Sequence, residues 1–424
     1  MMTRRDALTV LAGLPVVPSA AQSPAPVLRR IVPSTNQTLI LDPNGHVGVW
    51  TGPGSQQNKY GEMGLGHRNE LELDTLYPIT SLSNVVSAAV GTGCSFVVLA
   101  DGRLLGWGSN AQGALGTTPL SEVEVTASTR PSADAPTLQA VRIDAVDVAA
   151  GGSQYGFGLA LTRDGRVFAW GNNRFGRLGI GPMPVVNFKT HTPAPMTYMA
   201  YPVPVPGLSN VKAIAVGHEH ALALLGDGTV RAWGYNKEGQ LGDGTLLDRD
   251  RPVTVQGVSN AIAIGGGGAF SAALLADGTV TTWGSAAGGE LGRPLPEQKT
   301  DASTPYPVPA LVPGLKGVRS IAVGMGHVLA ITQAATVMSW GWQTYGAAGL
   351  GVSGGGGQFT PKEIKGMTGV QAVYARYNRS FAVLTNGRIF CWGAPVPEFN
   401  RSAGRARDVA ATPTLLRLVG LDNP

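Results

Sequence analysis

VKAIAVGHEHALALLGDGTVRAWGYNKEGQLGDG, residues 211–244, is the clearest copy of a unit that recurs along the chain. A tryptophan recurs at the same place in each unit, as Trp50, Trp107, Trp170, Trp233, Trp283, Trp340 and Trp392. Successive tryptophans lie 57 residues apart on average, so seven units account for nearly all of the 424 residues. A period of this length indicates a repeat architecture in which one supersecondary unit is stacked many times.

Each unit predicts four short strands. In the quoted copy, apolar runs at Val211–Val216 and Ala221–Leu225 are followed by a turn and a third strand, Thr229–Trp233. A fourth strand begins with a proline, as in Arg251-Pro252-Val253, because a sheet tolerates proline at a strand start or on an edge. One such sheet cannot cover its own faces, so neighbouring units must bury them. The sequence therefore predicts an all-β fold, a seven-bladed β-propeller with four-stranded antiparallel blades.

The turn between the second and third strands is predicted from Asp-Gly or Asn-Gly, which favour a type I′ hairpin. These dipeptides are Asn44-Gly45, Asp101-Gly102, Asp164-Gly165, Asp227-Gly228, Asp277-Gly278 and Asn386-Gly387. Unit six has Ala334-Ala335 instead, which predicts a longer or looser hairpin. Strand alternation places these turns on one face of the ring. The G-x-x-H bends and the loops after Trp-Gly then lie on the other face.

The composition agrees with short strands joined by tight turns. The chain contains 60 Gly and 30 Pro and is 14% charged. The glycines have no three-residue period, which excludes collagen, and each glycine in a helix interior would cost roughly 1 kcal/mol, which argues against a helical bundle. The net charge of +5 is too small to indicate a nucleic-acid partner. We expect the two cysteines, Cys94 and Cys391, to be packed side chains without a disulfide.

The pattern G-x-x-H-x-x-A-L…D-G-x-V-x-x-W-G-x-N-x-x-G-x-L-G resembles the repeat of the regulator of chromosome condensation family. The match is carried by Gly217, His220, Asp227, Gly228, Trp233, Gly234, Asn236, Gly239, Leu241 and Gly242. The resemblance covers nearly all of residues 28–421 and implies a seven-bladed propeller, here of the bacterial exported type. Secreted members of this family include β-lactamase inhibitors that bind through a variable face. A shared fold does not by itself fix the function.

The first residues predict an export signal, residues 1–21, ahead of a single propeller domain of seven repeats, residues 22–424. Arg4-Arg5 precedes a short apolar stretch and then small residues up to Ala21, the order found in cleaved signals. The paired arginines resemble a twin-arginine signal, but Ala7 stands where that signal has Phe, so the general secretory route stays open. No later apolar run reaches the roughly 18 residues of a membrane span. We therefore expect a periplasmic or extracellular protein without stable membrane insertion.

The face that carries the variable loops is predicted to be the recognition surface, because the Asp-Gly turns on the other face only repeat. Aromatic side chains and arginine commonly anchor interfaces. The predicted partner-binding residues are Phe175, Tyr235, Trp342, Tyr345, Tyr377, Arg379, His220 and His327. For each side chain the alternative is a position wedged between blades. The repeated tryptophans are predicted to pack between blades.

Other patterns suggest chemistry only weakly. His218, His220 and His327 could imitate a metal site, but the last two come from units that are not neighbours in the ring. Three aspartates between residues 243 and 250 are expected to cap a turn and not to bind calcium. Residues 349–355 match nucleophile-elbow and dinucleotide strings, but no helical period follows them. We expect no catalytic residue, metal or cofactor.

Three functions are compatible with these features. We expect first an exported, non-enzymatic recognition or scaffold propeller, a monomer that binds another protein and no nucleic acid. The family resemblance also implies guanine-nucleotide exchange on a small GTPase, which the export signal and the lack of a basic tail argue against. A propeller enzyme with its site at the channel mouth is the third, and six histidines in the chain make it weak. Arg401, Arg405 and Arg407 could bind an acidic partner or form a solvated rim.

Overall fold

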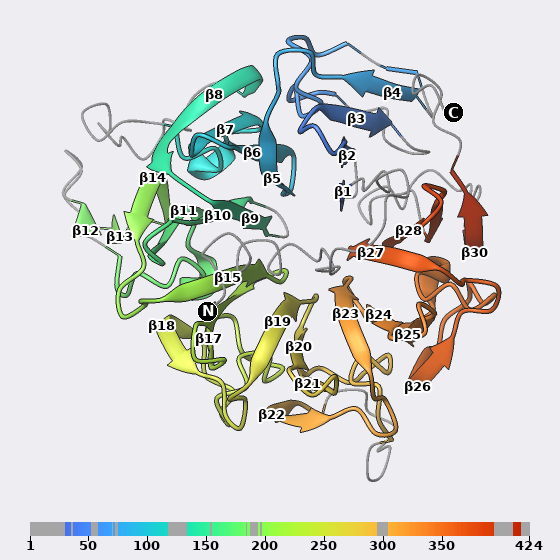
Figure 1. Cartoon of the computed structure of the whole chain (residues 1–424). Helices are drawn as coiled ribbons and strands as arrows, with labels where there is room; N and C mark the ends of the chain where they lie inside the picture. Colours follow the sequence, from blue (N-terminus) through green and yellow to red (C-terminus); the bar gives the residue numbers. More distant parts are fainter. Residues whose placement is uncertain are drawn as a thin grey trace, which may run out of the picture.

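The chain forms a ring of seven four-stranded antiparallel sheets around a central axis, as seen in the computed structural model (Figure 1). The structure describes residues 30–416, apart from 35–36, 52–57, 70, 73–74, 118–133, 153–154, 184, 187–193, 196, 295–303 and 394–409. The predicted all-β, seven-bladed propeller is therefore confirmed. The predicted export signal and Arg401, Arg405 and Arg407 lie outside the described residues. Within them, no helix is long and apolar enough to cross a membrane.

Each blade is a sheet of four strands. The strands are arranged in chain order, with the first nearest the central axis and the fourth at the rim of the ring (Figure 1). Blade one has β1 (Arg30–Pro33), β2 (Thr38–Leu41), β3 (Val47–Thr51) and β4 (Thr75–Pro78); blade two has β5 (Val85–Val90), β6 (Cys94–Leu99), β7 (Arg103–Gly108) and β8 (Ala135–Asp144). Blade three has β9 (Asp147–Gly151), β10 (Phe157–Leu161), β11 (Val167–Asn172) and β14 (Tyr198–Pro204), with a small extra hairpin of β12 (Val185–Val186) and β13 (Ala194–Pro195). Blade four has β15 (Val211–Val216), β16 (His220–Leu225), β17 (Val230–Gly234) and β18 (Arg249–Thr254).

The remaining three blades repeat this order. Blade five has β19 (Ala261–Gly266), β20 (Phe270–Leu275), β21 (Val280–Gly284) and β22 (Tyr306–Leu311); blade six has β23 (Val318–Val323), β24 (His327–Thr332), β25 (Val337–Trp342) and β26 (Gly357–Glu363); blade seven has β27 (Val370–Arg376), β28 (Arg379–Leu384), β29 (Ile389–Gly393) and β30 (Ala410–Leu415). Short 3₁₀ turns occur at η1 (Ala111–Gly113), η3 (Arg174–Gly176) and η4 (Thr344–Gly346).

Among the described strands, none is shared between the first and last blades, and side-chain packing joins these two blades. The C-terminal strand β30 pairs with β29, so it completes blade seven and does not cross to blade one. At the junction, Ile31 and Trp50 of blade one pack with Phe381 and Val383 of blade seven. The rings of Trp50 and Phe381 meet edge to face with centroids 6.1 Å apart.

The hairpin turns lie where the sequence predicts them, but their type differs. In blade four, Gly228 donates its N–H to the Leu225 carbonyl and Leu225 donates to the Thr229 carbonyl, which makes a three-residue loop. Only the glycine has a positive φ, +81°, whereas type I′ requires two such residues. Ala335 of unit six has φ +58° and donates its N–H to the Thr332 carbonyl in the same way. The predictions of a type I′ turn and of a looser sixth hairpin were therefore wrong.

The prolines of the fourth strands lie inside those strands and seldom at their start. On the third strand of blade four, Ala232 pairs with Val253, but Gly234 pairs with Arg249. The stretch opposite Trp233, which includes Pro252, therefore forms a bulge. A register shift of the same kind surrounds a proline of the fourth strand in most other blades. In blade two it surrounds Pro136, although no proline was predicted for the fourth strand of that unit. A bulge leaves backbone groups outside the ladder, so proline removes no ladder hydrogen bond there.

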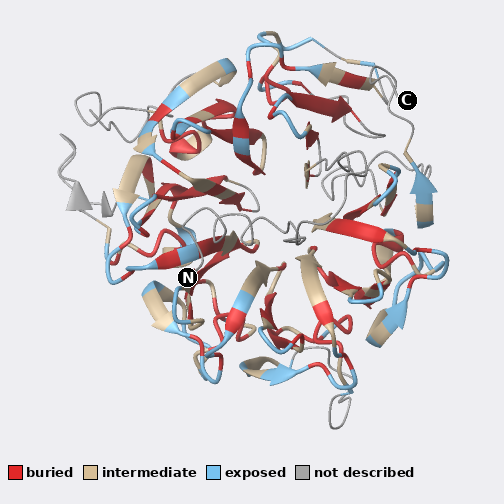
Figure 2. Ribbon diagram, viewed as in Figure 1, coloured by how far each residue is buried: buried red, intermediate tan, exposed pale blue. Residues whose placement is uncertain are grey.

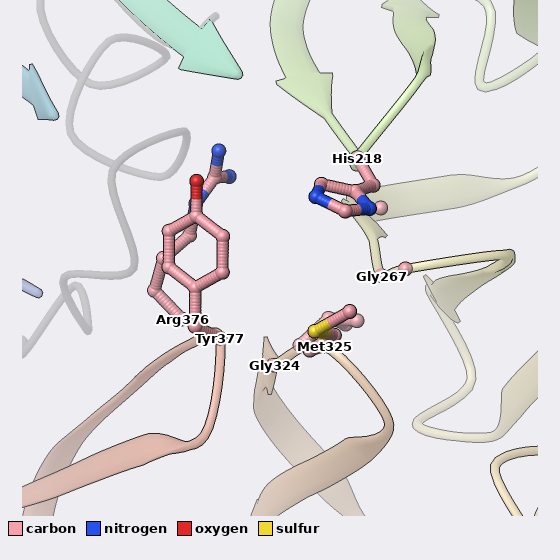
Figure 3. Close-up of a pocket in the computed structure, with 10 residues that line it drawn as sticks. His218, Gly267, Gly324, Met325, Arg376 and Tyr377 are labelled. Atoms are coloured by element: carbon pink, nitrogen blue, oxygen red, sulfur yellow. The ribbon is translucent and has the colours of Figure 1, made fainter. Parts of the chain in front are cut away.

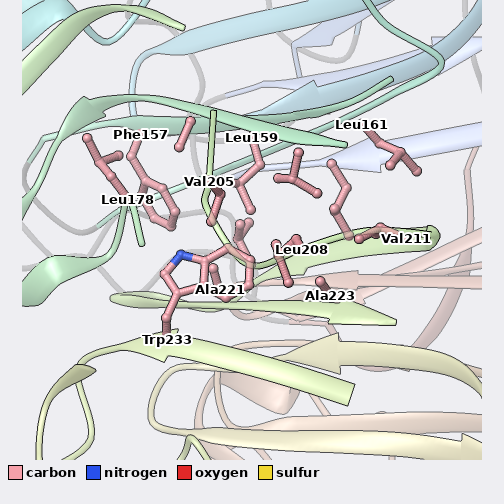
Figure 4. Close-up of a cluster of buried hydrophobic side chains, with 14 of the residues drawn as sticks. Phe157, Leu159, Leu161, Leu178, Val205, Leu208, Val211, Ala221, Ala223 and Trp233 are labelled. Carbon is pink, nitrogen blue, oxygen red and sulfur yellow. The ribbon is translucent and has the colours of Figure 1, made fainter. Parts of the chain in front are cut away.

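The hydrophobic core lies between the blades, and the outer strands are the exposed ones (Figure 2). Between blades three and four, Trp233 packs on Phe157, Leu159 and Ala221 (Figure 4). Six tryptophans also donate their Nε1–H to a loop carbonyl of the preceding blade: Trp107 to Glu62 (2.8 Å), Trp170 to Ala114 (3.0 Å), Trp233 to Arg177 (3.0 Å), Trp283 to Gln240 (2.9 Å), Trp340 to Glu290 (2.9 Å) and Trp392 to Ala347 (3.0 Å). Their predicted packing role is confirmed.

Cys94 and Cys391 are not joined in a disulfide. Cys94 is fully buried between blades two and three, and burial raises the pKa of its thiol to about 12. A thiol that stays protonated is a poor nucleophile, so Cys94 acts as a small apolar side chain.

Candidate functional site

The loops between third and fourth strands share one internal scaffold. In four of them, an asparagine side-chain oxygen accepts a backbone N–H from five residues later: Met63 to Asn58 (3.2 Å), Leu115 to Asn110 (3.1 Å), Leu178 to Asn173 (2.9 Å) and Leu241 to Asn236 (2.9 Å). Gly239, with φ +77°, closes the loop of blade four, and a Cβ there would lie 2.6 Å from the Cα of Pro307 in the next blade. These loops are therefore held by an internal hydrogen bond, and the loop of blade four also packs closely against the next blade. We name the side of the ring that carries these loops the loop face, and the side with the hairpin turns the turn face.

Two residues form the tip of each of these loops, immediately before its closing glycine. The first tip row is Lys59, Ala111, Arg174, Lys237, Ala287 and Thr344, and the second tip row is Tyr60, Gln112, Phe175, Glu238, Gly288 and Tyr345. The corresponding loop of blade seven lies outside the described residues. The residues of these rows differ from blade to blade, whereas four of the six loops share the asparagine hydrogen bond beneath them.

The residues of the second tip row adopt two backbone conformations. Which one is found correlates with the residue that lies two positions further along the chain. Tyr60, Glu238 and Gly288 donate their N–H to the side chain of Glu62, Gln240 and Glu290, respectively. In the other three loops that later residue is alanine or arginine, and no such bond forms. There the tip residue has a left-handed φ: Gln112 +54°, Phe175 +60° and Tyr345 +59°. For a bulky aromatic residue this conformation is an outlier that marks a turn or backbone strain.

Phe175 and Tyr235 are brought together on the loop face from blades three and four. Their ring centroids lie 4.7 Å apart with the planes tilted by 50°. The exposed guanidinium of Arg174 lies over the Phe175 ring at 4.6 Å. All three side chains remain at least partly open to solvent. Two of the predicted binding residues thus form one contiguous aromatic patch with a cation on top.

Trp342 and Tyr345 of blade six both lie on the loop face, but they differ in exposure. Tyr345 is exposed, whereas Trp342 lies over the glycines of blade five, where a Cβ on Gly288 would come within 1.3 Å of its ring. Trp342 also donates a hydrogen bond to the buried carboxyl of Glu290. Burial raises the pKa of Glu290 to about 7, against the opposing effect of these hydrogen bonds. Trp342 is therefore only partly open to solvent, because part of its ring packs against the loop of blade five.

The mouth of the central channel on the loop face is closed by blade seven. Arg376 donates from Nη2 to the Ala150 carbonyl (2.6 Å) and from Nη1 to the Val216 carbonyl (3.2 Å), on blades three and four. Tyr377, with φ +48°, reaches the Gly152 carbonyl at 3.4 Å and faces the ring of His218. Figure 3 shows Arg376 and Tyr377 on one side of a small pocket and His218 on the other. These contacts join blades that are not neighbours in the ring.

Behind this closure lies a central cavity of about 280 Å³. The inner strand of every blade contributes to its wall, mostly with small side chains such as Ala89, Ala149 and Ala215. Tyr374 adds a hydroxyl, and burial raises the pKa of that group to about 12, so it stays protonated. The cavity is thus walled mainly by small apolar residues, with Arg30, Ser320, Tyr374 and Arg376 as its polar side chains.

Three predicted binding residues lie in the interior instead of on the surface. His220 and His327 have no exposed area, and Arg379 is buried. Nε2 of His220 bonds to the Ser271 hydroxyl (2.9 Å), and Nε2 of His327 bonds to the Ser380 hydroxyl (2.7 Å), in each case on the next blade. The sequence position that they share is an inter-blade position, so its variation reflects packing. Their prediction as surface residues is corrected.

The other patterns weighed from the sequence have structural roles here. Glu219, between the two histidines of blade four, forms a buried ion pair with Arg177 of blade three. Asp243 accepts hydrogen bonds from the N–H and hydroxyl of Thr245 (3.0 and 2.8 Å) and pairs with Arg249 at 2.8 Å, as expected of a turn cap. Among the described residues, no group of three or more His, Cys, Asp or Glu side chains is placed to hold a metal.

Sequence reasoning missed two groups that the structure brings forward. Arg376 stands where most other units have the glycine that ends the first strand, and this break in the repeat was the available signal. The cation–aromatic pairs Lys59-Tyr60 and Arg174-Phe175 occur at the same tip positions of two units. Aligning the loops on their closing glycines reveals that recurrence.

Comparison with known proteins agrees with the repeat and the fold. The profile of the RCC1-like domain matches residues 53–421. The chain belongs to the RCC1-like domain family. Among RCC1-like relatives, RCC2 of Mus musculus is 30% identical over 308 residues, 71% of this chain and 48% of that protein. Protein pim1 of Schizosaccharomyces pombe is 32% identical over 222 residues, 52% of this chain and 39% of that protein. The chain thus spans less than half the length of these relatives.

Solved RCC1-like propellers share the architecture at lower identity. Yeast RCC1 (Prp20), solved with Kap60 bound, is 20% identical with a TM-score of 0.67, covering 95% of this chain and 91% of that one. Prp20p from Saccharomyces cerevisiae, described with its binding to Gsp1p and histones, is 21% identical with a TM-score of 0.67, covering 91% and 90%. At these identities the likeness shows the fold alone.

Proposed function

We propose that this RCC1-like propeller recognises another protein through its loop face. The observation that carries the proposal is the conformation of the surface aromatics. Phe175, Tyr345 and Tyr377 all have left-handed φ values, and such a residue costs about 1–3 kcal/mol of backbone strain. Strained backbone that presents solvent-accessible aromatic rings is typical of binding sites. The turn face instead repeats the same short hairpins.

Protein binding also agrees with what is described for the yeast propellers above. The aromatic patch of Phe175 with Tyr235, with the cation of Arg174 beside it, supports a role in protein contact. Guanine-nucleotide exchange and catalysis at the channel mouth, the two alternatives from the sequence, stay predictions. Export through the first 21 residues stays a prediction too, and N-terminal sequencing of the protein recovered from cell fractions tests it.

The proposal is tested by placing a photo-crosslinking residue at Gln343, next to the tip of blade six, and comparing variants. We expect Phe175→Ser/Tyr345→Ser to lower the yield of a defined crosslinked partner by about tenfold, because exposed aromatics are common anchors. Val86→Ser/Ile262→Ser removes two exposed apolar side chains from the first strands of other blades and serves as the matched control, with less than about a twofold effect. Equal losses in the two double variants would show that the loop face is not the binding surface.

A further inference from the structure

The first tip row places cations, and no acids, at the same position of several loops. Three of its six members are Lys59, Arg174 and Lys237, and all three are exposed. They come from blades one, three and four. The second tip row sets an aromatic ring beside two of them, with the charged group 5.3 Å from the Tyr60 ring and 4.6 Å from the Phe175 ring.

Two cations of the turn face are neutralised by their own hairpin turns, because Arg103 pairs with Asp101 at 2.8 Å and Arg166 pairs with Asp164 at 2.7 Å. Arg388, beside the turn of blade seven, instead lies over the Phe390 ring at 5.0 Å. On the loop face, neither Lys59 nor Arg174 has a carboxylate within 4 Å among the described residues. Lys237 has only a long contact, 3.8 Å, with Asp248.

A cation held over an aromatic ring is fixed in place and keeps donors for a further partner. The guanidinium of Arg174 lies over the Phe175 ring, and a cation–π contact of this kind does not use up its N–H donors. These donors match a carboxylate, which accepts two parallel hydrogen bonds. Burial of that contact by surrounding apolar groups would strengthen it.

We propose that the protein bound by the loop face presents carboxylates to Lys59, Arg174 and Lys237 and apolar groups to the neighbouring rings. This inference rests on the proposed function and adds the chemistry of the partner. An acidic protein surface fits better than a nucleic acid, because the three cations are separated and Glu238 and Asp250 lie among these loops. A nucleic acid needs a continuous basic track along its backbone.

The test uses a fluorescein-labelled peptide of alternating glutamate and tyrosine, with a lysine–tyrosine peptide and a single-stranded oligothymidine for comparison. The variant Lys59→Ser/Arg174→Ser/Lys237→Ser removes three positive charges from the loop face. The matched control, Arg103→Ser/Arg166→Ser/Arg388→Ser, removes three exposed charges beside the hairpin turns. Fluorescence anisotropy at about 50 and 200 mM salt, within the range where charge screening changes, measures each affinity.

We expect the glutamate–tyrosine peptide to bind the natural chain best and to lose about tenfold in affinity in the loop-face variant, with less than about a twofold change in the control. Equal losses in both variants would reveal attraction to net charge only and overturn the proposal. Tighter binding of oligothymidine than of the acidic peptide would also overturn it, in favour of a nucleic-acid surface.

The crosslinked partner separates a failure of this inference from a failure of the proposed function. If Phe175→Ser/Tyr345→Ser abolishes the crosslink while the three-charge loop-face variant keeps it, protein binding stands and the preference for carboxylates is wrong. If neither variant changes the crosslink, the loop face itself is wrong as the binding surface.

Discussion

At the residue scale, side chains on adjacent blades are matched in polarity. Gln37, His220 and His327 each hydrogen-bond to a serine of the next blade. Where that neighbour is apolar, the same position is a phenylalanine: Phe157 packs in one cluster with Ala221, and Phe270 packs in one cluster with Val328. A buried polar group without a partner is costly, so the two positions must change together.

The stability of the protein should decrease as the pH is lowered, because His220 and His327 are buried. Burial lowers the pKa of His220 to about 3 and that of His327 to about 4, from 6.5. Below pH 6.5 these two histidines therefore bind protons in the unfolded chain, whereas in the folded chain they stay neutral. The free energy of unfolding should decrease by up to about 1.4 kcal/mol per pH unit for each histidine, down to about pH 4.

Urea unfolding at several pH values checks this slope. In His220→Phe/His327→Phe, which installs the residue found in two other units, the decrease should be largely absent. His67→Gln removes a histidine outside the inter-blade interior and should leave the slope unchanged. A slope that survives in the double variant would mean that other groups cause it.

The sequence could predict the aromatics of the loop face but not this buried row. Phe175, Tyr235 and Tyr345 follow from strand alternation, which decides the side of the ring on which a loop lies. His220 and Arg379 also stand at strand ends on that side, and alternation does not say whether such a residue points outward or toward the next blade. That depends on contacts between residues about 50 positions apart, such as His220 with Ser271, 51 positions later.

At the element scale, the hairpin turn is set by one left-handed residue. Six turns use glycine there, and Ala335 adopts the same φ, +58°, with a Cβ. The sequence located six turns through the strong local preferences of Asp-Gly and Asn-Gly, and it located the turn of unit six from its place in the repeat. It did not determine the loop length, because Asp-Gly suits both a two-residue turn and the three-residue turn observed here.

Glycine at position 335 should stabilise the protein. Ala335→Gly removes the strain of a left-handed alanine, and we expect the free energy of unfolding to rise by about 0.5–1 kcal/mol. The neighbouring substitution Ala334→Gly is the control, since that residue has no positive φ and glycine adds only chain entropy, with a loss of about 0.5–1 kcal/mol. Urea unfolding measures both, and a destabilised Ala335→Gly variant would contradict the assignment of strain.

At the scale of the whole molecule, seven similar blades are closed by contacts that break the repeat. The period predicts the number of blades, but it carries no information on how the ring is held shut. Among the described residues, the indole N–H of Trp50 has no acceptor, unlike those of the other six repeat tryptophans. Arg376 belongs to blade seven, at the same junction, and reaches across the channel to carbonyls 226 and 160 residues away in sequence.

Arg376→Gly, which restores the repeat residue, should destabilise the ring. Two charge-assisted hydrogen bonds to backbone carbonyls are lost, and we expect the free energy of unfolding to fall by about 2–4 kcal/mol. Amide hydrogen exchange should accelerate at the ends of β9 and β15, which carry the two acceptors. Arg388→Gly removes an exposed arginine of the same blade and should change either measurement little. Equal effects of the two substitutions would show that Arg376 is not a cross-channel brace.

The contiguous blades also set an order of events during synthesis. Among the described strands, each of the first six sheets takes its four strands from one continuous stretch of chain, so blades can be added in order as the chain leaves the ribosome, each burying a face of the one before it. Arg376 lies in the first strand of the seventh sheet, so its carbonyl acceptors in β9 and β15 wait uncovered until nearly all of the chain has emerged. A nascent chain stalled before residue 370 would therefore be an open arc with an accessible axial channel, and the translation of a few more residues would seal it.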